Sequence, residues 1–236
     1  MRKSIILFFL VVYGSLSAQT EKIKADKFNT IRIFGPFKVT LVKAATSRAE
    51  IEYRGINPDE VLIKNDDNTL QLKLRNRSFL DFTDNNRNRN RSYAIVTIYY
   101  TSLENIEAKA GAIIRSTELI EATKLTIVSK MGAEVQLQIK TQKLFLDSSM
   151  GSQVELTGIA ETAEIKSKMG STVNASQLQS QQVEVSSSMG SDVSVFAERE
   201  LNASADFGGS ISYKGNPEHK HTSTFLGAEV KAKRKY

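Results

Sequence analysis

A motif marked by glycine recurs seven times between residues 110 and 230, and this repeat restricts the possible folds more than any other feature. Each copy has a small or apolar residue, a glycine, a short residue, a usually polar residue and a β-branched residue. The glycines are Gly111, Gly132, Gly151, Gly170, Gly190, Gly208 and Gly227, with steps of 21, 19, 19, 20, 18 and 19 residues. A period near 19 is too short for helix-pair repeats and suits one coil of a β-solenoid.

In the five copies from Gly132 to Gly208, apolar and polar residues alternate with a period of two. Positions seven, five and three before the glycine, and three and five after it, are apolar or small. Around Gly151 these are Leu144, Leu146, Ser148, Val154 and Leu156. Such alternation predicts β-strands with one buried face. The residue directly before the glycine, methionine in four copies, falls in the same series, so we expect it to point inward.

Two arrangements of these strands are compatible with the alternation. In a parallel β-helix, equivalent residues stack about 4.8 Å apart and the glycine marks a corner. In an antiparallel meander, each glycine lies in a hairpin turn. The corners lack Asn-Gly and Asp-Gly pairs, four methionines occupy one site, and the linkers at 138–143, 157–162 and 176–182 vary in length. The sequence therefore favours an all-β parallel β-helix with rungs of about 19 residues.

Three segments resemble a known bacterial family. They are the leading stretch from Phe28 to Leu41, the repeated Met-Gly-Ser-x-Val units and the closing stretch from Tyr213 to Pro217. They are similar to the putative auto-transporter adhesin head family, or GIN domain. The resemblance implies a single-stranded, right-handed parallel β-helix in envelope or secreted proteins. It implies no catalytic residues. The family commonly has Ser-Gly-Ala or Ser-Gly-Ser at the corner, so Met-Gly-Ser is expected to change the corner packing more than the fold.

Residues 1–18 have the pattern of a signal peptide. Arg2 and Lys3 precede an apolar run from Ile5 to Tyr13, which is too short to span a bilayer, and small residues lead to Ala18. We expect cleavage after Ala18 and a mature chain that begins near Gln19, without a membrane-spanning segment. The alternative is an uncleaved membrane anchor. No cysteine lies near the cut, which excludes a lipoprotein anchor there.

The composition is consistent with an exported solenoid. The 236 residues include no cysteine, so stacked apolar rungs and backbone hydrogen bonds must stabilise the fold without disulfides. The net charge of +6 becomes +4 without residues 1–18, because 30 basic residues then face 26 acidic ones. This small excess does not indicate a nucleic-acid partner.

The first half of the chain keeps a strand pattern but lacks the regular glycines. Alternating runs occur from Ile31 to Tyr99, and Asp66 to Thr69 forms a good turn between two of them. We predict one β-helix domain at residues 19–236. In it, residues 19–107 form irregular coils and a cap, and residues 108–236 form the regular rungs.

Two charged segments admit a functional and a structural interpretation. Residues 75–91 contain Arg75, Arg77, Arg87, Arg89 and Arg91 among Asn and Asp. Arginine forks suit carboxylate and phosphate, so this run could contact a polyanion or an acidic glycan. The favoured interpretation is a solvated loop whose charge keeps a sheet edge from pairing. The tail from Lys231 to Tyr236 is interpreted in the same way, as a charged end that blunts the last rung.

The sequence offers little support for catalysis. The outward positions change from rung to rung, as in Glu134, Gln153, Thr172 and Asp192, so they form no acidic ladder. The serine column of Ser129, Ser148, Ser167 and Ser187 has no accompanying base, and we expect serines bonded to one another or to backbone inside the coil.

Metal-binding signals are equally weak. His219 and His221 would share one side of a strand, but an exposed loop is favoured over a metal site. The methionine column is interpreted as filler of a corner void rather than a soft-metal site. We predict no catalytic, cofactor-binding or metal-binding residues.

Two function classes remain open from the sequence. The first is a non-enzymatic, exported binding module of the cell envelope, periplasmic, surface-located or secreted, which contacts a glycan, an envelope protein or another copy of itself. The second is a β-helix carbohydrate-active enzyme, either a polysaccharide lyase or a glycosidase. The absence of tryptophan weakens sugar stacking in both classes.

Overall fold

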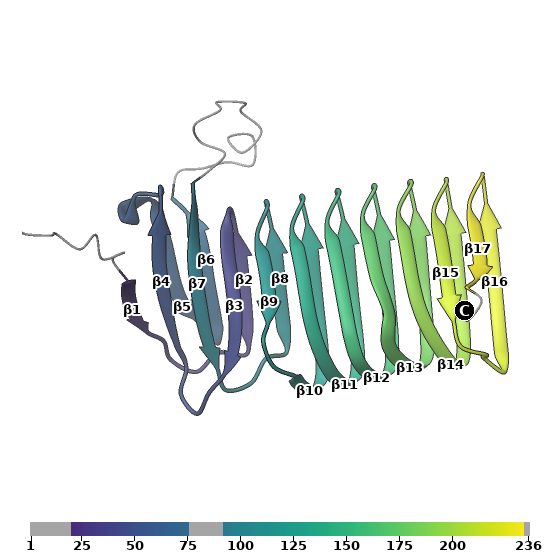
Figure 1. Cartoon of the computed structure of the whole chain (residues 1–236), viewed down its shortest axis with the longest axis horizontal. Helices are drawn as coiled ribbons and strands as arrows, with labels where there is room; N and C mark the ends of the chain where they lie inside the picture. The colour runs from purple at the N-terminus through teal and green to yellow at the C-terminus, as the bar shows by residue number, and fades with distance from the viewer. Residues whose placement is uncertain (1–19, 76–91, 234–236) are drawn as a thin grey trace, which may run out of the picture.

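The computed structural model describes residues 20–75 and 92–233 and shows an elongated stack of β-strands (Figure 1). Within these residues there are seventeen strands and one short 3-10 helix, η1 (Pro58–Glu60). The expected signal peptide, residues 1–18, lies outside the described residues. The buried side chains form one continuous hydrophobic core from Phe28 to Tyr213.

Five long strands make up the regular part, and each pairs in parallel with the next. They are β10 (Ile120–Lys130), β11 (Glu134–Ser149), β12 (Gln153–Lys168), β13 (Thr172–Ser188) and β14 (Asp192–Asp206). Like residues stack on like, since Val154 pairs with Val135 on one side and with Val173 on the other. The predicted parallel β-solenoid is confirmed, and the antiparallel alternative is wrong for this region.

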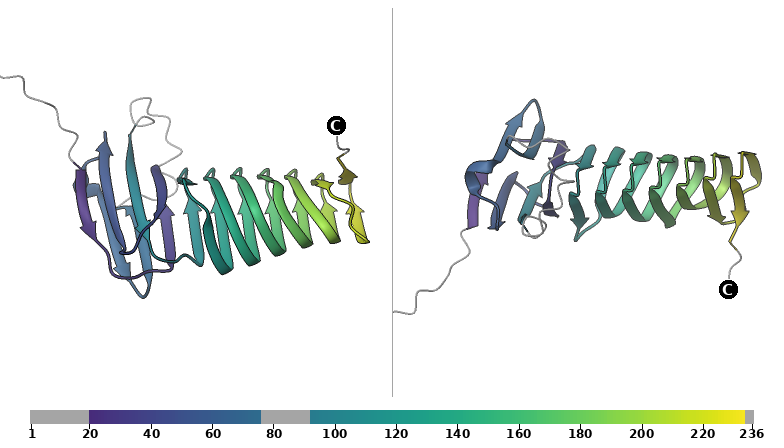
Figure 2. Two further views of the ribbon diagram at one scale, coloured as in Figure 1. Left: turned by 60° about the horizontal axis from the view of Figure 1, so that its bottom comes forward. Right: turned by 90° about the horizontal axis from the view of Figure 1, so that it is seen from above.

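Each long strand bends near its middle, so that its two halves belong to opposite faces of a flattened coil (Figure 2). In β11, the buried residues are odd-numbered as far as Thr141 and even-numbered from Leu144 to Ser148, with Ser149 also buried next to the turn. The exposed pair Gln142 and Lys143 lies at the bend. The half that follows a glycine turn is named the post-turn face, and the half that precedes one is named the pre-turn face.

The two faces meet at two edges. The bends near Thr141, Ala160, Ser180 and Ala197 form the bend edge. The turns around the repeated glycines form the glycine edge, at the top of Figure 1. The pairing register slips near the bend in β12 and again in β13. The variable linkers of the sequence therefore lie at the bend edge.

Two consecutive left-handed residues make each turn of the glycine edge. Met169 has a φ of 57° and Gly170 one of 67°, the signs of a type I′ turn. Neighbouring turns are also joined, because Gly151 N donates to Met169 O at 3.1 Å. The predicted glycine corner is confirmed. A turn type common in hairpins here connects two faces of a parallel coil.

The expected inward position of the methionines is wrong. Met150 and Met189 are 49% and 54% exposed, and Met169 is 43% exposed. At the tip of a two-residue turn the chain passes from one face to the other, so the side chain of the first tip residue points away from both faces. The buried corner position is instead the residue after the glycine, such as Ser152 or Ser171.

The rungs of the N-terminal half are stacked in an order that differs from their order in the chain. The strands are β2 (Thr30–Phe34), β3 (Phe37–Lys43), β6 (Thr69–Leu74), β7 (Tyr93–Tyr100), β8 (Asn105–Lys109) and β9 (Ile113–Ser116). β2 lies between β6 and β8, and β3 lies between β7 and β9, all in parallel. β8 and β9 then pair with β10 and β11. The earliest of these rungs is thus inserted between two later ones.

Antiparallel strands close the N-terminal end of the stack. β4 (Arg48–Arg54) pairs with β7, β1 (Thr20–Lys24) pairs with β4, and β5 (Val61–Asp66) pairs with β6. The predicted turn between Asp66 and Thr69 is confirmed, since Asp67 and Asn68 have φ values of 48° and 58° between β5 and β6. That residues 19–236 fold as a single domain stays a prediction.

The C-terminal rung differs from the others in its inward residues. It contains β15 (Ser210–Lys214), β16 (His219–Phe225) and β17 (Glu229–Ala232). β16 pairs only with β14 among the described strands, and every residue of β16 is exposed. The positions that hold Leu201, Ala203 and Ala205 in β14 are taken in β16 by Lys220, Thr222 and Thr224.

Candidate binding surface

The predicted serine column lies inside the coil, next to the glycine edge. Ser148 Oγ is 2.9 Å from Ser152 Oγ, and Ser152 Oγ donates to Ser129 O at 2.8 Å. The following rungs repeat this contact between Ser167 and Ser171 and between Ser187 and Ser191, each at 2.8 Å. The expected bonding of buried serines to one another and to backbone is confirmed. Their hydroxyl groups link rungs rather than face solvent.

Six of the seven residues that precede the turn glycines form an apolar line along the glycine edge, in which Met131 is half-buried and the other five are exposed; the seventh, Ala110, is buried. We name this line the apolar ridge: Met131, Met150, Met169, Met189, Phe207 and Leu226. Phe207 and Leu226 are 54% and 60% exposed, and Phe225 packs edge-on against Phe207 with ring centroids 5.8 Å apart. Successive rungs are about 4.8 Å apart, so the ridge repeats at that spacing.

The backbone of the apolar ridge is in a conformation that its residues disfavour. Every ridge residue has a φ between 46° and 58°. Left-handed conformation costs a residue with a side chain about 1–2 kcal/mol, and type I′ turns favour Asn, Asp and Gly. A methionine placed there repeatedly, and exposed to water, is not explained by turn geometry or by core packing.

The two histidines lie on the outer side of the last pre-turn strand. Both His219 and His221 are exposed, and His221 borders a small hollow of ≈ 130 Å³ with Glu164, Glu184 and Asn202. They are on strand β16 rather than in the favoured exposed loop, because the backbone of β14 supplies hydrogen-bond partners for this segment. Within residues 20–75 and 92–233, no three His, Cys, Asp or Glu side chains are placed so that together they could hold a metal ion.

The pre-turn face carries a carboxylate cluster that the sequence analysis missed. Glu164 and Glu184 are direct neighbours in register, and Glu200 lies one row away, around a hollow of ≈ 260 Å³ that Phe145 also lines. Lys166 Nζ is 2.6 Å from Glu164 Oε1. This hydrogen bond and the charge of Glu164 raise the pKa of Lys166. Counting six residues back from each turn glycine would have revealed the stacked pair.

The post-turn face is polar, as the alternation predicts. The outward residues Glu134, Gln153, Thr172 and Asp192 are all exposed. In the next outward row, Gln136 Nε2 donates a hydrogen bond to Glu155 Oε2 at 3.1 Å. The side chains border a shallow hollow of ≈ 280 Å³. This face presents mixed hydrogen-bonding groups without a run of one charge.

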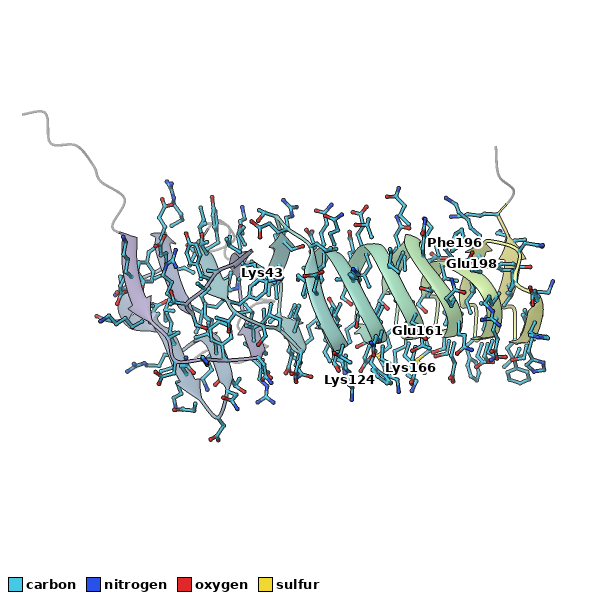
Figure 3. The ribbon with its side chains drawn as sticks, turned by 90° about the horizontal axis from the view of Figure 1, so that it is seen from below. Lys43, Lys124, Glu161, Lys166, Phe196 and Glu198 are labelled. Carbon is cyan, nitrogen blue, oxygen red and sulfur yellow. The ribbon has the colours of Figure 1, made fainter. Side chains whose placement is uncertain are left out.

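Figure 3 views the bend edge, with Glu161 on it, Lys124 and Lys166 toward the pre-turn face and Phe196 toward the post-turn face. Here an ion pair joins the inserted rung to the regular coils. Lys43 Nζ lies 3.1 Å from Glu121 Oε2, and this contact lowers the pKa of Glu121.

A larger hollow with basic walls lies at the N-terminal end of the pre-turn face. Its volume is ≈ 660 Å³. The residues that line it are Arg32, Ile33, Phe34, Leu62, Gln71, Lys73, Leu74, Arg75, Glu107, Lys109 and Met131. Glu107 is the one acidic residue among them, and it pairs with both Arg32, at 3.3 Å, and Lys109. The lining thus combines cations with an apolar floor.

Both charged segments of the sequence lie only partly within the described residues. Arg75 borders the basic hollow, and Arg77, Arg87, Arg89 and Arg91 lie outside the described residues. In the C-terminal tail, Lys231 is on β17 and pairs with Glu229, and residues 234–236 lie outside the described residues. None of the residues that the structure describes forms a helix long and apolar enough to cross a membrane.

Comparison with known proteins identifies similar sequences and folds. Residues 27–217 match the family described as "Putative auto-transporter adhesin, head GIN domain", which confirms the resemblance that the sequence indicated. No curated protein matches the chain. Among solved structures, a putative adhesin from Bacteroides fragilis has a TM-score of 0.78 at 25% identity, and the match covers 91% of this chain and 96% of that one.

Two more distant crystal structures share the fold. A putative adhesin from Parabacteroides merdae has a TM-score of 0.71 at 17% identity. A protein described as a putative lipid binding protein from Parabacteroides distasonis has a TM-score of 0.67 at 15% identity. Each match covers 92% of this chain and 96% of the other protein. At these identities the likeness concerns the fold alone.

Proposed function

The chain belongs to the family of putative auto-transporter adhesin head (GIN) domains, and we propose that it is an exported, non-enzymatic, adhesin-like binding module of the cell envelope. In this proposal the module contacts its partner along the glycine edge. The partner is a glycan or an envelope protein. The signal-peptide pattern at residues 1–18 supports export, and the family supports a binding role.

The apolar ridge is the observation that carries this proposal. It exposes apolar side chains on successive rungs and holds each in a left-handed conformation. A contiguous exposed apolar surface with polar flanks is typical of an interaction site. Methionine is a flexible, polarizable side chain that adapts to varied partner surfaces. A contact role therefore accounts for both the exposure and the conformational cost.

Replacing ridge methionines by asparagine distinguishes a role in partner binding from a role in the stability of the fold. The triple variant Met150→Asn, Met169→Asn, Met189→Asn suits the left-handed conformation better, so we expect an equal or higher melting temperature. Against a panel of immobilised glycans and envelope proteins, we expect the variant to bind at least about tenfold more weakly than the unaltered protein, because the apolar contacts are lost. A control with Gln142→Asn, Glu161→Asn and Gln181→Asn at the bend edge should bind normally. Binding that survives in the ridge variant would contradict the proposal.

Two further measurements test export and the non-enzymatic role. Cell fractionation should find the mature chain outside the cytoplasm, with its N-terminus near Gln19 by mass spectrometry. Recovery of an intact chain only from detergent-extracted inner membrane would contradict cleavage and release. The release of reducing ends or unsaturated products from a polysaccharide panel would instead support the carbohydrate-active enzyme.

A further inference from the structure

Four lysines share one row of the pre-turn face, directly beside the glycine edge. The backbone register pairs Lys73 with Phe34, Phe34 with Lys109, and Lys109 with Lys130. It continues from Lys130 through Ser149 to Lys168. We name Lys73, Lys109, Lys130 and Lys168 the lysine row. At about 4.8 Å per strand, its backbone positions span about 24 Å along the solenoid axis.

The carboxylates near the lysine row neutralise only its middle. Lys109 pairs with Glu107, and Lys130 Nζ lies 2.7 Å from Asp147 Oδ2. In the described part of the chain, Lys73 and Lys168 at its two ends form no ion pair. Glu107 is shared with Arg32, so the N-terminal end of the row keeps an excess of positive charge.

The two ends of the row have different surroundings. At the N-terminal end, Lys73 and Lys109 flank Phe34 in the basic hollow of ≈ 660 Å³, a volume that suits a small-molecule or oligomer segment. At the C-terminal end, the same row continues as Ser188 and Asp206. The carboxylates of Glu184 and Glu200, on the next two strands, also lie on this part of the face. Charge therefore changes from basic to acidic along one face.

We infer that the lysine row and the basic hollow bind a linear acidic polysaccharide, with its carboxylate or sulfate groups on the lysines. This assignment rests on the proposed binding role and names the ligand class for it. Ammonium groups arranged in one line match a single polymer that carries charge at intervals along its length. The acidic region beyond Lys168 repels the polymer and sets the end of the contact.

The arrangement of side chains favours a polysaccharide over nucleic acid. A DNA duplex presents two phosphate strands, whereas this row offers a single line of cations. Single-stranded nucleic acid is held by stacking of successive bases on several aromatic rings. One aromatic residue, Phe34, lies in register between Lys73 and Lys109, and a single ring does not provide the successive stacking that bases require.

The test compares two variants of the full chain that lose the same charge. The row variant carries Lys73→Gln, Lys109→Gln, Lys130→Gln and Lys168→Gln. The matched control carries Lys140→Gln, Lys143→Gln, Lys214→Gln and Lys231→Gln, which lie away from the glycine edge. Binding of polygalacturonate, dextran sulfate, neutral dextran and a single-stranded DNA oligonucleotide is measured by calorimetry at two salt concentrations.

We expect the unaltered protein to bind polygalacturonate or dextran sulfate and to bind neutral dextran at least tenfold more weakly. The row variant should lose more than tenfold in affinity and the control less than threefold, with a smaller salt dependence in the row variant. The two acidic polymers distinguish carboxylate from sulfate recognition. Equal affinities of the two variants, or tighter binding of the oligonucleotide than of both acidic polymers, would overturn the inference.

The row variant and the ridge variant test two separate proposals, and either proposal can be wrong while the other holds. If the asparagine ridge variant keeps its partner binding while the row variant loses acidic polysaccharide, the proposed contact along the ridge is wrong and the ligand class stands. If the ridge variant loses its partner while both lysine variants bind acidic polymers equally, the ligand class is wrong and the binding role stands. Circular dichroism of all variants checks that each retains the strand content of the unaltered chain.

Discussion

Glycine has two different roles among the single residues of this solenoid. Gly151, at the glycine edge, has a φ of 69° and open space where a Cβ would lie. Gly158, near the bend of β12, has a φ of 114°, and a Cβ there would lie 2.0 Å from the carbonyl oxygen of Ile139. The first position needs only the left-handed conformation, whereas the second also needs the absence of a side chain.

This difference predicts unequal effects of alanine. Gly151→Ala should cost about 1 kcal/mol of unfolding free energy, the cost of a left-handed alanine. Gly158→Ala should cost about 3 kcal/mol, because conformational strain adds to a clash with the neighbouring rung. Urea unfolding of the two variants measures the difference. Equal losses would show that the backbone at Gly158 relaxes freely.

The hydroxyl group of Tyr100 is buried and has no hydrogen-bond partner among the described residues. Burial, and then the charges of Glu118 and Glu121, raise its pKa to about 12. The folded state holds this proton more tightly than the unfolded state, whose tyrosine pKa is about 10. The corresponding stabilisation is present below pH about 10 and is lost as the pH rises through about 12.

Tyr100→Phe should therefore raise the unfolding free energy at pH 7 by about 1 kcal/mol, because it removes an unsatisfied buried hydroxyl. The variant should also lose less stability between pH 10 and 12 than the unaltered protein. Tyr53 keeps part of that alkaline dependence, since burial and its hydrogen bond to Glu21 raise its pKa as well. Thermal unfolding at a series of pH values measures both effects. A lower stability of the variant at pH 7 would indicate that the hydroxyl has a partner.

Among the elements, the last rung shows how the stack ends. β16 has one neighbouring strand in the described part of the chain, so its other edge is open to pairing. It places Lys220 at an inward position, where Lys220 Nζ donates to Tyr213 Oη at 3.3 Å. Inward charges on an edge strand hinder pairing between molecules, because a second chain would have to bury them. The polar residues Thr222 and Thr224 act in the same direction.

The variant Lys220→Leu, Thr222→Val, Thr224→Val gives the last rung the inward residues of a regular rung. We expect it to associate through this edge in proportion to its concentration, as analytical ultracentrifugation would show. A matched variant with His219→Leu, His221→Val and Ser223→Val changes outward residues of the same strand and should associate less. If the variant with Lys220→Leu, Thr222→Val and Thr224→Val stays monomeric at all concentrations, these three residues do not protect the edge of β16 from association.

At the scale of the whole molecule, the two ends of the stack are built differently (Figure 1). Antiparallel strands close the N-terminal end, and β16 and β17 form the C-terminal end. In a solenoid each rung is stabilised mainly by its neighbours, so a rung with one neighbour opens more easily than an internal rung.

Hydrogen exchange should follow this arrangement. We expect the amides of β1, β5, β16 and β17, each of which pairs with one strand, to exchange fastest and those of β11, β12 and β13 to exchange slowest among the described strands. The inserted rung β2 and β3 should match the internal rungs, since it has neighbours on both sides. Exchange measured by mass spectrometry tests this order. Fast exchange in β2 and β3 would show that the inserted rung is only loosely held.

The sequence by itself determined the features that depend on local period. The glycine spacing set the rung length, and the alternation identified the buried faces, including the valines at 135, 154, 173 and 193 and the serine column. These features could be predicted because a repeated pattern of period two can bury one face only by stacking on its own copies.

Only the tertiary structure decided where the candidate contacts lie. The direction of the ridge methionines depends on two left-handed residues at the turn, which reverse the direction that simple alternation predicts. The lysine row joins Lys73 to Lys109 through Phe34, across the inserted rung, and no local pattern links these residues. The physical reason is that backbone hydrogen bonds between distant segments set the order of rungs, and this order brings side chains far apart in the chain onto one line.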